Sequence, residues 1–196
     1  MSIHTAEARD FHLALMTTTK GGIWDDLGWL CMANIQQVAR DAGKALKKLG
    51  LRSNEPVLIP VGGRAEDISA ILAVIDAGGV AVPFHHKSHR EMRSSLESAS
   101  KARFVLSIPD HEKRSVPNPI KISENLPPKR PLLDEAAMIT FTSGSTGKPK
   151  GVVLSRNKIS AKLAAICEAL EIFDPPNAAV PLQLQFSFGQ WALFYH

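Results

Sequence analysis

The sequence predicts an α/β domain with a mixed, largely parallel sheet flanked by helices. Short apolar runs alternate with helix-period segments between residues 34 and 108, which is the order of successive β-α-β units. Residues 136–142, AAMITFT, form a nearly unbroken apolar run, as expected for an interior strand that is buried on both faces. We expect three helices to cover this sheet, at residues 34–49, 64–77 and 155–171.

The first of these helices has a clear apolar face and a clear end. Its apolar residues recur at the 3.6-residue spacing of an α-helix: Ile35, Val38, Ala42, Ala45, Leu46 and Leu49. Lysines crowd the last turn, where they complement the helix dipole, and Gly50 is placed to end the helix. The apolar run PVLIPV (56–61) then predicts a strand. Residues 1–30 are a weakly patterned lead-in for which we predict no element.

The middle of the chain repeats the strand and helix alternation. Residues 64–78 predict a helix that is apolar over most of its circumference, and therefore buried against the sheet. VAVPF (80–84) and RFVLSI (103–108) predict the next two strands. Between them, Ser88 followed by Glu91 has the pattern of a capping box, which predicts that Ser88 caps a further helix.

A change of composition separates this part from the last predicted elements. Prolines alternate with charged residues over 109–131, which predicts an irregular connection on the surface. Strand 136–142 then runs directly into a glycine-rich loop, which a short strand and a helix follow. Ser155 is placed to cap that helix. Its apolar face is predicted to comprise Ile159, Leu163, Ile166, Cys167 and Leu170.

Composition limits the classes of protein to which the chain can belong. Hydrophobic residues make up 44% and charged residues 21% of the 196 residues, the balance of a soluble domain with a core. The net charge of +4 suits an anionic ligand, but no Arg/Lys stripe supports nucleic-acid binding. Cys31 and Cys167 show no disulfide pattern and are expected to be small core hydrophobes in a cytoplasmic protein. Residues 1–15 lack the pattern of a secretory signal, and the most apolar window (68–84) is too interrupted to span a membrane.

The loop after strand 136–142 has the composition of an anion-binding site. Glycines 144, 147 and 151 are expected to permit positive φ and a close approach of ligand to backbone, and successive N–H groups in such a turn can bind an anion. Hydroxyl groups and lysines supply further donors, and Pro149 stiffens the turn. A polyphosphate is the ligand we predict, and a solvated hairpin turn is the alternative. The loop is not a Walker A motif, because Pro149 follows Gly147-Lys148 where Ser or Thr is required.

Residues 142–152, TSGSTGKPKGV, resemble the phosphate-loop motif of the adenylate-forming superfamily. This superfamily includes acyl- and aryl-CoA synthetases, peptide-synthetase adenylation domains and firefly luciferase. Residues 35–59 and 68–84 are similar to its first helix and strand and to its glycine-glycine-strand-proline element. The resemblance covers residues 30–196. It implies that 1–196 is a partial AMP-binding domain, the first part of the family's large N-terminal domain, without the C-terminal domain.

The resemblance implies a two-step reaction. A carboxylate attacks the α-phosphate of ATP and expels pyrophosphate, and a thiol of coenzyme A or of a carrier protein's phosphopantetheine then takes the acyl group. The loop would stabilise charge on the leaving pyrophosphate, with Mg²⁺ sharing that charge. No nucleophile is implied in this chain. The implied phosphate-binding residues are Thr142, Ser143, Gly144, Ser145, Thr146, Gly147, Lys148, Pro149 and Lys150.

Several of the family's motifs have no match in the sequence after Lys150. These are the adenine-binding segment, the metal-binding Glu, the ribose-binding Asp and the catalytic lysine. The resemblance therefore implies a fragment that is inactive alone. A non-catalytic phosphate-binding remnant or interaction module is the alternative. A downstream reading frame with an aromatic-Gly-x-Thr-Glu element would favour the enzyme.

Two smaller groups of residues complete the candidate sites. Phe186, Phe188 and Trp191 match the place where the family has part of its acid-binding wall, so they predict an apolar or aromatic pocket, with plain core packing as the alternative. The carboxylic acid itself is not identified. A second group, His85, His86 and His89, follows strand 80–84. With no carboxylate or cysteine nearby to complete a metal site, we predict that these histidines face solvent and bind no metal.

Overall fold

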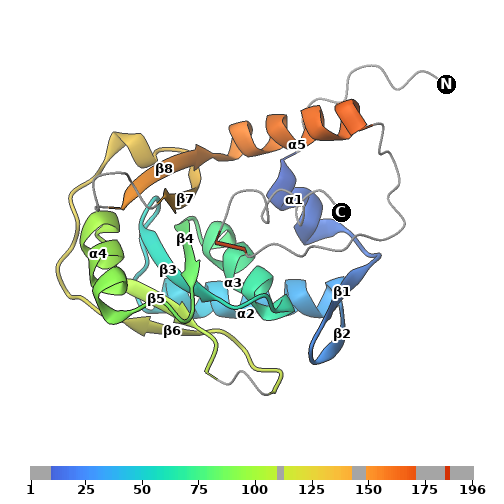
Figure 1. The fold of residues 1–196 in the computed structure, drawn as a ribbon, viewed down its shortest axis with the longest axis horizontal. Coiled ribbons are helices and arrows are strands. Elements are labelled where there is room, and N and C mark those ends of the chain that lie inside the picture. The colour runs from blue at the N-terminus through green and yellow to red at the C-terminus, as the bar shows by residue number, and fades with distance from the viewer. Residues whose placement is uncertain (1–9, 110–112, 143–148, 171–183, 186–196) are drawn as a thin grey trace.

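The computed structural model describes residues 10–109, 113–142, 149–170 and 184–185. They form a six-stranded mixed sheet in the order β6-β5-β3-β4-β7-β8, with helices on both faces (Figure 1). Four neighbouring strands are parallel: β5 (Phe104–Ser107), β3 (Pro56–Val61), β4 (Val80–His85) and β7 (Ala136–Thr142). The edge strands β6 (Asn118–Lys121) and β8 (Lys150–Ser155) are antiparallel to their neighbours. The predicted fold class and the interior position of residues 136–142 are therefore confirmed.

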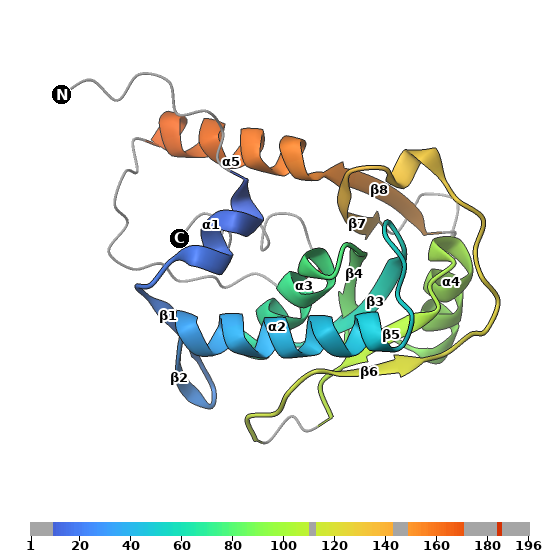
Figure 2. The same ribbon diagram turned by 180° about the vertical axis from the view of Figure 1, so that it is seen from behind.

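The sheet separates the core into two apolar clusters, and helices cover each of its faces. On one face, α2 (Met32–Lys48) and α3 (Ala65–Asp76) pack together, and α1 (Phe11–Thr17) and α5 (Arg156–Leu170) join the same apolar cluster. Figure 2 shows α2 running across this face. On the opposite face, α4 (Arg90–Ser100) contributes Leu96 to a smaller cluster. The remaining elements are the hairpin of β1 (Gly22–Asp25) and β2 (Gly28–Cys31), and a 3-10 turn, η1 (Pro131–Leu133).

The end of α2 follows the prediction closely. Gly50 has a φ of +88°, a left-handed conformation that glycine adopts without steric cost. Its N–H donates to the carbonyl of Lys47 at 3.0 Å, and the N–H of Leu51 donates to the carbonyl of Leu46 at 3.1 Å. These two bonds form a Schellman motif, which satisfies carbonyls that the helix end would leave unpaired.

The start of α4 differs from the prediction. Ser88 does not cap this helix: the helix begins at Arg90, and His89 is the N-cap residue, without a side-chain cap bond. The amide of Ser88 instead donates to the carbonyl of His85 at 2.9 Å. The turn that leaves β4 therefore occupies residues up to Ser88, and the helix can begin only after it. The other predicted cap is present, since the amide of Lys158 donates to Ser155 Oγ at 3.4 Å.

Three further predictions needed correction. Residues 109–131 are not entirely irregular, because they contain β6; Pro119 is tolerated there because an edge strand pairs on one side alone. The lead-in 1–30 contains α1 and the β1–β2 hairpin, which its weak pattern did not reveal. Cys31 and Cys167 are free thiols that are half-buried, not fully in the core. Among the described residues, no helix combines the length and apolar character needed to cross a bilayer.

A buried ion pair joins the beginnings of two parallel strands. Arg103 precedes β5 and Glu55 precedes β3, and their side chains are 5% and 3% exposed. Arg103 Nε donates to one carboxylate oxygen of Glu55, and Nη2 donates to the other at 2.8 Å. Nη2 also donates to the carbonyl of Gly50 at 3.0 Å. The hydrogen bonds from Arg103 to Glu55 raise the pKa of the guanidinium although its burial opposes this.

His12 lies where α1 meets α3 and α5. The side chain is 7% exposed, and Nε2 has no hydrogen-bond partner, while the ring is hydrogen-bonded to the backbone of Leu72. Burial lowers the pKa of His12, and the positive charge of Arg156 lowers it further; Asp76 and Asp10 act in the opposite direction. The imidazole is therefore held in its neutral form in the folded protein.

Acidification is expected to loosen the packing of α1 through His12. Because the pKa of His12 is lower in the folded state than in the unfolded state, the unfolded chain binds the proton first as the pH falls below about 6.5. Stability therefore falls with falling pH in that range. The His12→Asn variant, which keeps a donor near Nδ1, should lose less stability between pH 7 and pH 5, measured by urea unfolding. His89→Asn is the matched control and should behave as the wild type, and parallel pH curves for His12→Asn and wild type would refute this role.

Candidate active site at the carboxyl edge of the sheet

The glycine-rich motif begins on the last residue of β7 and ends at the start of β8. Thr142 and Lys150 pair across these antiparallel strands, and Thr142 Oγ donates to the carbonyl of Lys150 at 3.4 Å. Both side chains are exposed, and Pro149 is half-buried. The described ends of the motif are thus brought together at the carboxyl end of an interior strand. The other predicted site residues lie outside the described residues: Ser143, Gly144, Ser145, Thr146, Gly147, Lys148, Phe186, Phe188 and Trp191.

Gly151 is required for packing, not for a positive φ as the sequence suggested. It lies within β8, opposite Phe141 of β7, and its φ is not in the left-handed region. A Cβ at this position would come within 2.9 Å of Ile139 Cγ2 and 3.2 Å of the Phe141 ring. The glycine therefore lets Phe141 and Ile139 pack against the backbone of β8 directly below the loop.

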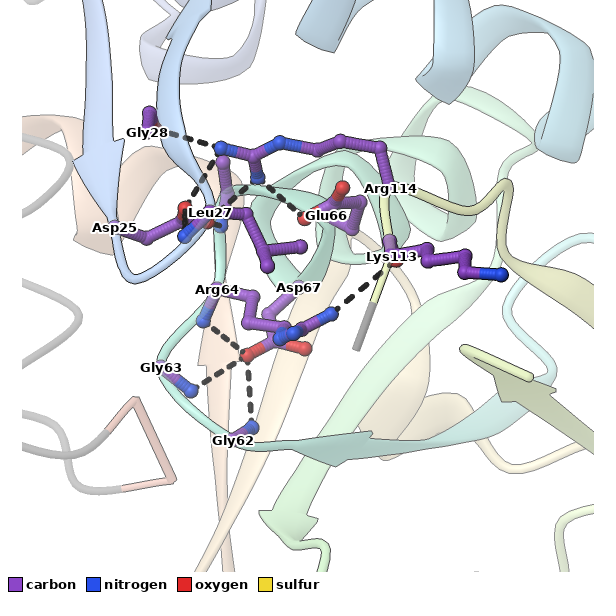
Figure 3. Close-up of polar contacts among 11 residues, drawn as sticks. Asp25, Leu27, Gly28, Gly62, Gly63, Arg64, Glu66, Asp67, Lys113 and Arg114 are labelled. Carbon is purple, nitrogen blue, oxygen red and sulfur yellow. Dashed lines mark hydrogen bonds and ion pairs between the residues drawn. The ribbon is translucent and has the colours of Figure 1, made fainter. Parts of the chain in front are cut away.

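A second glycine turn lies at the same edge, after β3, and it is filled by the chain itself. The amides of Gly62, Gly63 and Arg64 all donate to one carboxylate oxygen of Asp67, at 2.8, 2.7 and 2.8 Å (Figure 3). Gly63 has a φ of +93°, and Asp67 is fully buried. This turn has the inward-pointing amides of an anion site, but its anion is the side chain of Asp67 at the start of α3.

An arginine beside this turn ties three segments of the chain together. Arg114 donates to both carboxylate oxygens of Asp25 at 2.6 Å, to Glu66 Oε2 at 2.9 Å and to the carbonyl of Gly28 at 2.6 Å (Figure 3). Asp25 also accepts the amide of Ala65 at 3.0 Å, so it binds the first turn of α3. The guanidinium thus joins the segment after β5, the β1–β2 hairpin and α3.

The protonation states of this cluster follow from these contacts. Burial opposes ionisation of Asp25, but the hydrogen bonds from Arg114 and from the amides of Ala65 and Leu27 outweigh it, so the pKa of Asp25 lies below its usual value. The same hydrogen bond to Asp25 raises the pKa of Arg114, against the effect of burial. At neutral pH, Asp25 is therefore a carboxylate and Arg114 is a cation.

Asp25, Asp67 and Arg114 were not predicted as site residues from the sequence. For Asp67 a signal was present: an acidic residue in the first turn of a helix that follows a glycine pair is typical of a capping contact. Asp25 and Arg114 are 89 residues apart, and nothing in the spacing of either predicts that they meet. Their contact depends on how β5 and the hairpin are placed in the fold.

Removal of the Arg114 guanidinium is expected to destabilise the hairpin and the start of α3. Arg114→Gln would leave Asp25 and Glu66, which are 4% and 2% exposed, facing each other without their cation. The expected cost is about 2–4 kcal/mol. Hydrogen exchange should become faster in residues 22–31 and 62–66, while β7 and β8 stay protected. Arg93→Gln on α4 is the control. Unchanged hydrogen exchange in the hairpin of the Arg114→Gln variant would contradict the claim that Arg114 holds the hairpin to α3.

Two of the three histidines are more buried than we predicted. His85 and His86 are half-buried, and His89 is exposed. The ring of His86 lies against Gly62, where a Cβ would approach Nδ1 to 2.6 Å, and the rings of His85 and His86 meet edge-on at 5.0 Å. Within the part of the chain that the structure describes, no group of three or more His, Cys, Asp or Glu side chains is arranged to hold a metal ion.

The architecture is that of the N-terminal part of adenylate-forming enzymes. The N-terminal subdomain of NpsA from Klebsiella oxytoca, solved in complex with 3-hydroxyanthranilyl-AMSN, superposes with a TM-score of 0.71 at 22% identity, over 95% of this chain and 50% of that one. O-succinylbenzoate coenzyme A synthetase (MenE) from Bacillus subtilis, in complex with ATP and magnesium ion, superposes with a TM-score of 0.71 at 19% identity, over 94% of this chain and 53% of that one. At these identities, the likeness establishes the fold.

Sequence comparison establishes the family. The model of the AMP-binding enzyme family matches residues 16–196, and the chain belongs to that family. Nonribosomal peptide synthetase 8 from Aspergillus fumigatus is 30% identical over 164 residues, which is 75% of this chain and 2% of that protein. The chain thus spans about half the length of the similar structures and a small part of this relative.

Proposed function

We propose that this chain is the first part of an ATP-dependent, acid-activating ligase. The ligase joins a carboxylate to the α-phosphate of ATP, releases pyrophosphate, and passes the acyl group from the adenylate to a thiol. Residues 1–196 supply a partial AMP-binding domain, and the remaining nucleotide and acid contacts come from elsewhere in the full-length protein. The family match over residues 16–196, with the motif 142–152 between β7 and β8, is the observation that carries the proposal.

The loop's part in this reaction is to hold the triphosphate and its leaving group. Its sequence supplies amides and hydroxyls, and its described ends, Thr142 and Lys150, pair at the carboxyl edge of the sheet. Fixed donors of this kind are the groups that best stabilise phosphate charge. Mg²⁺, when bound, shares the charge of the phosphates. In the proposal, phosphate oxygens of the nucleotide are ligands of this ion. No residue of this chain acts as a nucleophile in the proposal.

The acyl acceptor is coenzyme A or the phosphopantetheine of a carrier protein. The similar peptide synthetase supports the carrier protein, and the similar coenzyme A synthetase supports coenzyme A. Phe186, Phe188 and Trp191 are proposed to line the pocket for the acid, which would favour an apolar or aromatic substrate. A non-catalytic phosphate-binding module is the second candidate, because a glycine- and hydroxyl-rich loop with lysines suits an anion whether or not a reaction follows.

Acid-dependent exchange between ATP and labelled pyrophosphate tests the proposal. The full-length protein that contains this chain should exchange label with at least one acid in a panel of amino, aryl and fatty acids. The active acid is then supplied with coenzyme A, or with a phosphopantetheinylated carrier protein, and the thioester formed identifies the acceptor. A protein that binds MgATP but exchanges label with no acid would support the non-catalytic module instead.

A further inference from the structure

We propose that His85 is a further phosphate-binding residue, which completes a row of donors formed with Lys150 and Thr142. The inference deepens the proposed function and rests on it. The ligand is the triphosphate group of the nucleotide. The observation behind it is the register of β3, β4, β7 and β8, which all reach the same edge of the sheet.

The register places His85 beside the first residue of the glycine-rich motif. Ala81 of β4 pairs with Met138 of β7 in a parallel ladder. Each strand ends four residues later, β4 at His85 and β7 at Thr142. If that register continues over these four residues, it sets His85 beside Thr142 at the spacing of neighbouring strands, about 4.8 Å. On its other side, His85 pairs with Val61, the last residue of β3.

The side chains of this row project from the same face of the sheet. Residues that pair in register share a face, and side chains alternate along each strand. Ala81 and Met138 belong to the core cluster that contains α2 and α3, whereas Val82 and Ile139 belong to the other cluster. His85 lies four residues after Ala81, and Thr142 lies four residues after Met138. Because alternate residues of a strand share a face, His85 and Thr142 lie on the same face as Ala81 and Met138. Lys150 pairs with Thr142 and shares that face.

The local geometry of His85 prepares it to donate a hydrogen bond. Its Nδ1 accepts the backbone amide of Lys87 at 3.2 Å. In the neutral imidazole one ring nitrogen is a donor and the other an acceptor, so this contact leaves the proton on Nε2. The ring can then donate to a phosphate oxygen without being charged. An ammonium, a hydroxyl and an imidazole N–H thus stand on three successive strands: Lys150, Thr142 and His85.

The neighbouring histidines do not share this position. His86 follows the end of β4, and its ring packs on Gly62 of the turn that Asp67 fills. His89 lies four residues after His85, where it is exposed at the N-cap of α4. His85 is thus the histidine that the register aligns with the motif, and His89 serves as a matched control.

The test uses the full-length protein with the variants His85→Ala, His85→Gln and His89→Ala. Loss of one donor to a charged phosphate should raise the KM for ATP about tenfold in His85→Ala, with kcat little changed, because ground-state binding is lost. His85→Gln, whose amide can donate from a similar position, should recover most of the loss. His89→Ala should match the wild type. The dissociation constant for MgATP, measured by calorimetry without acid, should move by the same factor.

The possible outcomes separate this inference from the proposed function. Wild-type values of KM and of the MgATP dissociation constant in His85→Ala would overturn the role of His85, whatever the acid. A loss that His85→Gln does not recover and that lowers the thermal midpoint would also overturn it, because it would mark a structural role. If the wild type shows no acid-dependent exchange, the proposed function fails, and the dissociation constants still decide whether His85 contacts phosphate.

Discussion

Replacement of Lys150 by alanine in the full-length protein is expected to lower the rate of acyl-adenylate formation about 100-fold, the loss typical of one preorganised donor to a developing anion. Lys150 is exposed on the first residue of β8 and pairs with Thr142 at the mouth of the loop. Its ammonium would stabilise charge that accumulates on the leaving pyrophosphate. Pyrophosphate release with a saturating acid and ATP measures this rate. We expect Thr146→Ala to act in the same direction.

The second half-reaction provides the internal control for Lys150→Ala. Transfer of the acyl group from a supplied acyl-adenylate to the thiol requires no pyrophosphate leaving group, so it should proceed at close to the wild-type rate. Lys162→Ala, which removes an exposed ammonium from α5, should change neither step. Equal losses in both half-reactions of Lys150→Ala would show that the residue maintains the fold instead of stabilising the leaving group.

Replacement of Arg103 by methionine is expected to be among the most destabilising single changes in this domain. It would leave the carboxylate of Glu55, which is 3% exposed, without the cation that donates two hydrogen bonds to it. The expected cost is about 3–5 kcal/mol. For a domain of this size, this corresponds to a fall of roughly 6–20 °C in the midpoint of its calorimetric unfolding transition.

The double variant Glu55→Leu/Arg103→Met separates two contributions to stability: the cost of leaving one buried charge unpaired, and the net stabilisation by the ion pair itself. Two apolar side chains of similar volume leave no buried charge, so most of the stability should return. Both Arg103→Met and Glu55→Leu alone should therefore be less stable than the double variant. If the double variant is as unstable as the worse single variant, the interaction with the carbonyl of Gly50, and not the ion pair, holds these strand ends together.

The parts of the fold that follow from local patterns were predictable. The spacing of apolar residues in α2, together with Gly50, places that helix and its end correctly, because both depend on contacts within a few residues. The strand ending at Thr142 was also predictable, since a run buried on both faces leaves few alternatives. The start of α4 was not, because the turn that leaves β4 took up Ser88 before the helix began.

The candidate site was predictable where it is continuous in sequence and not where it is assembled by the sheet. The motif 142–152 is contiguous, so its residue types could be recognised together. His85 lies 57 positions before Thr142, and the two residues end the parallel strands β4 and β7. Two residues separated by this distance in the sequence form no motif that could be recognised before the strands are placed. Gly151 shows a further limit, because a glycine needed for packing under Phe141 is indistinguishable in sequence from one needed for a turn.

Because the carboxylate of Asp67 occupies the turn after β3, this turn is expected to bind soluble anions poorly. Its carboxylate is tethered four residues from Gly63, and it already bonds three amides there. A tethered group acts at an effective concentration in the millimolar range or above for even a flexible link, and α3 makes this one rigid. Inorganic phosphate or pyrophosphate in solution must displace it from a buried position to enter. Two glycine turns of similar chemistry can therefore stand at one edge of the sheet, and in the function proposed above the nucleotide would bind at the loop after β7.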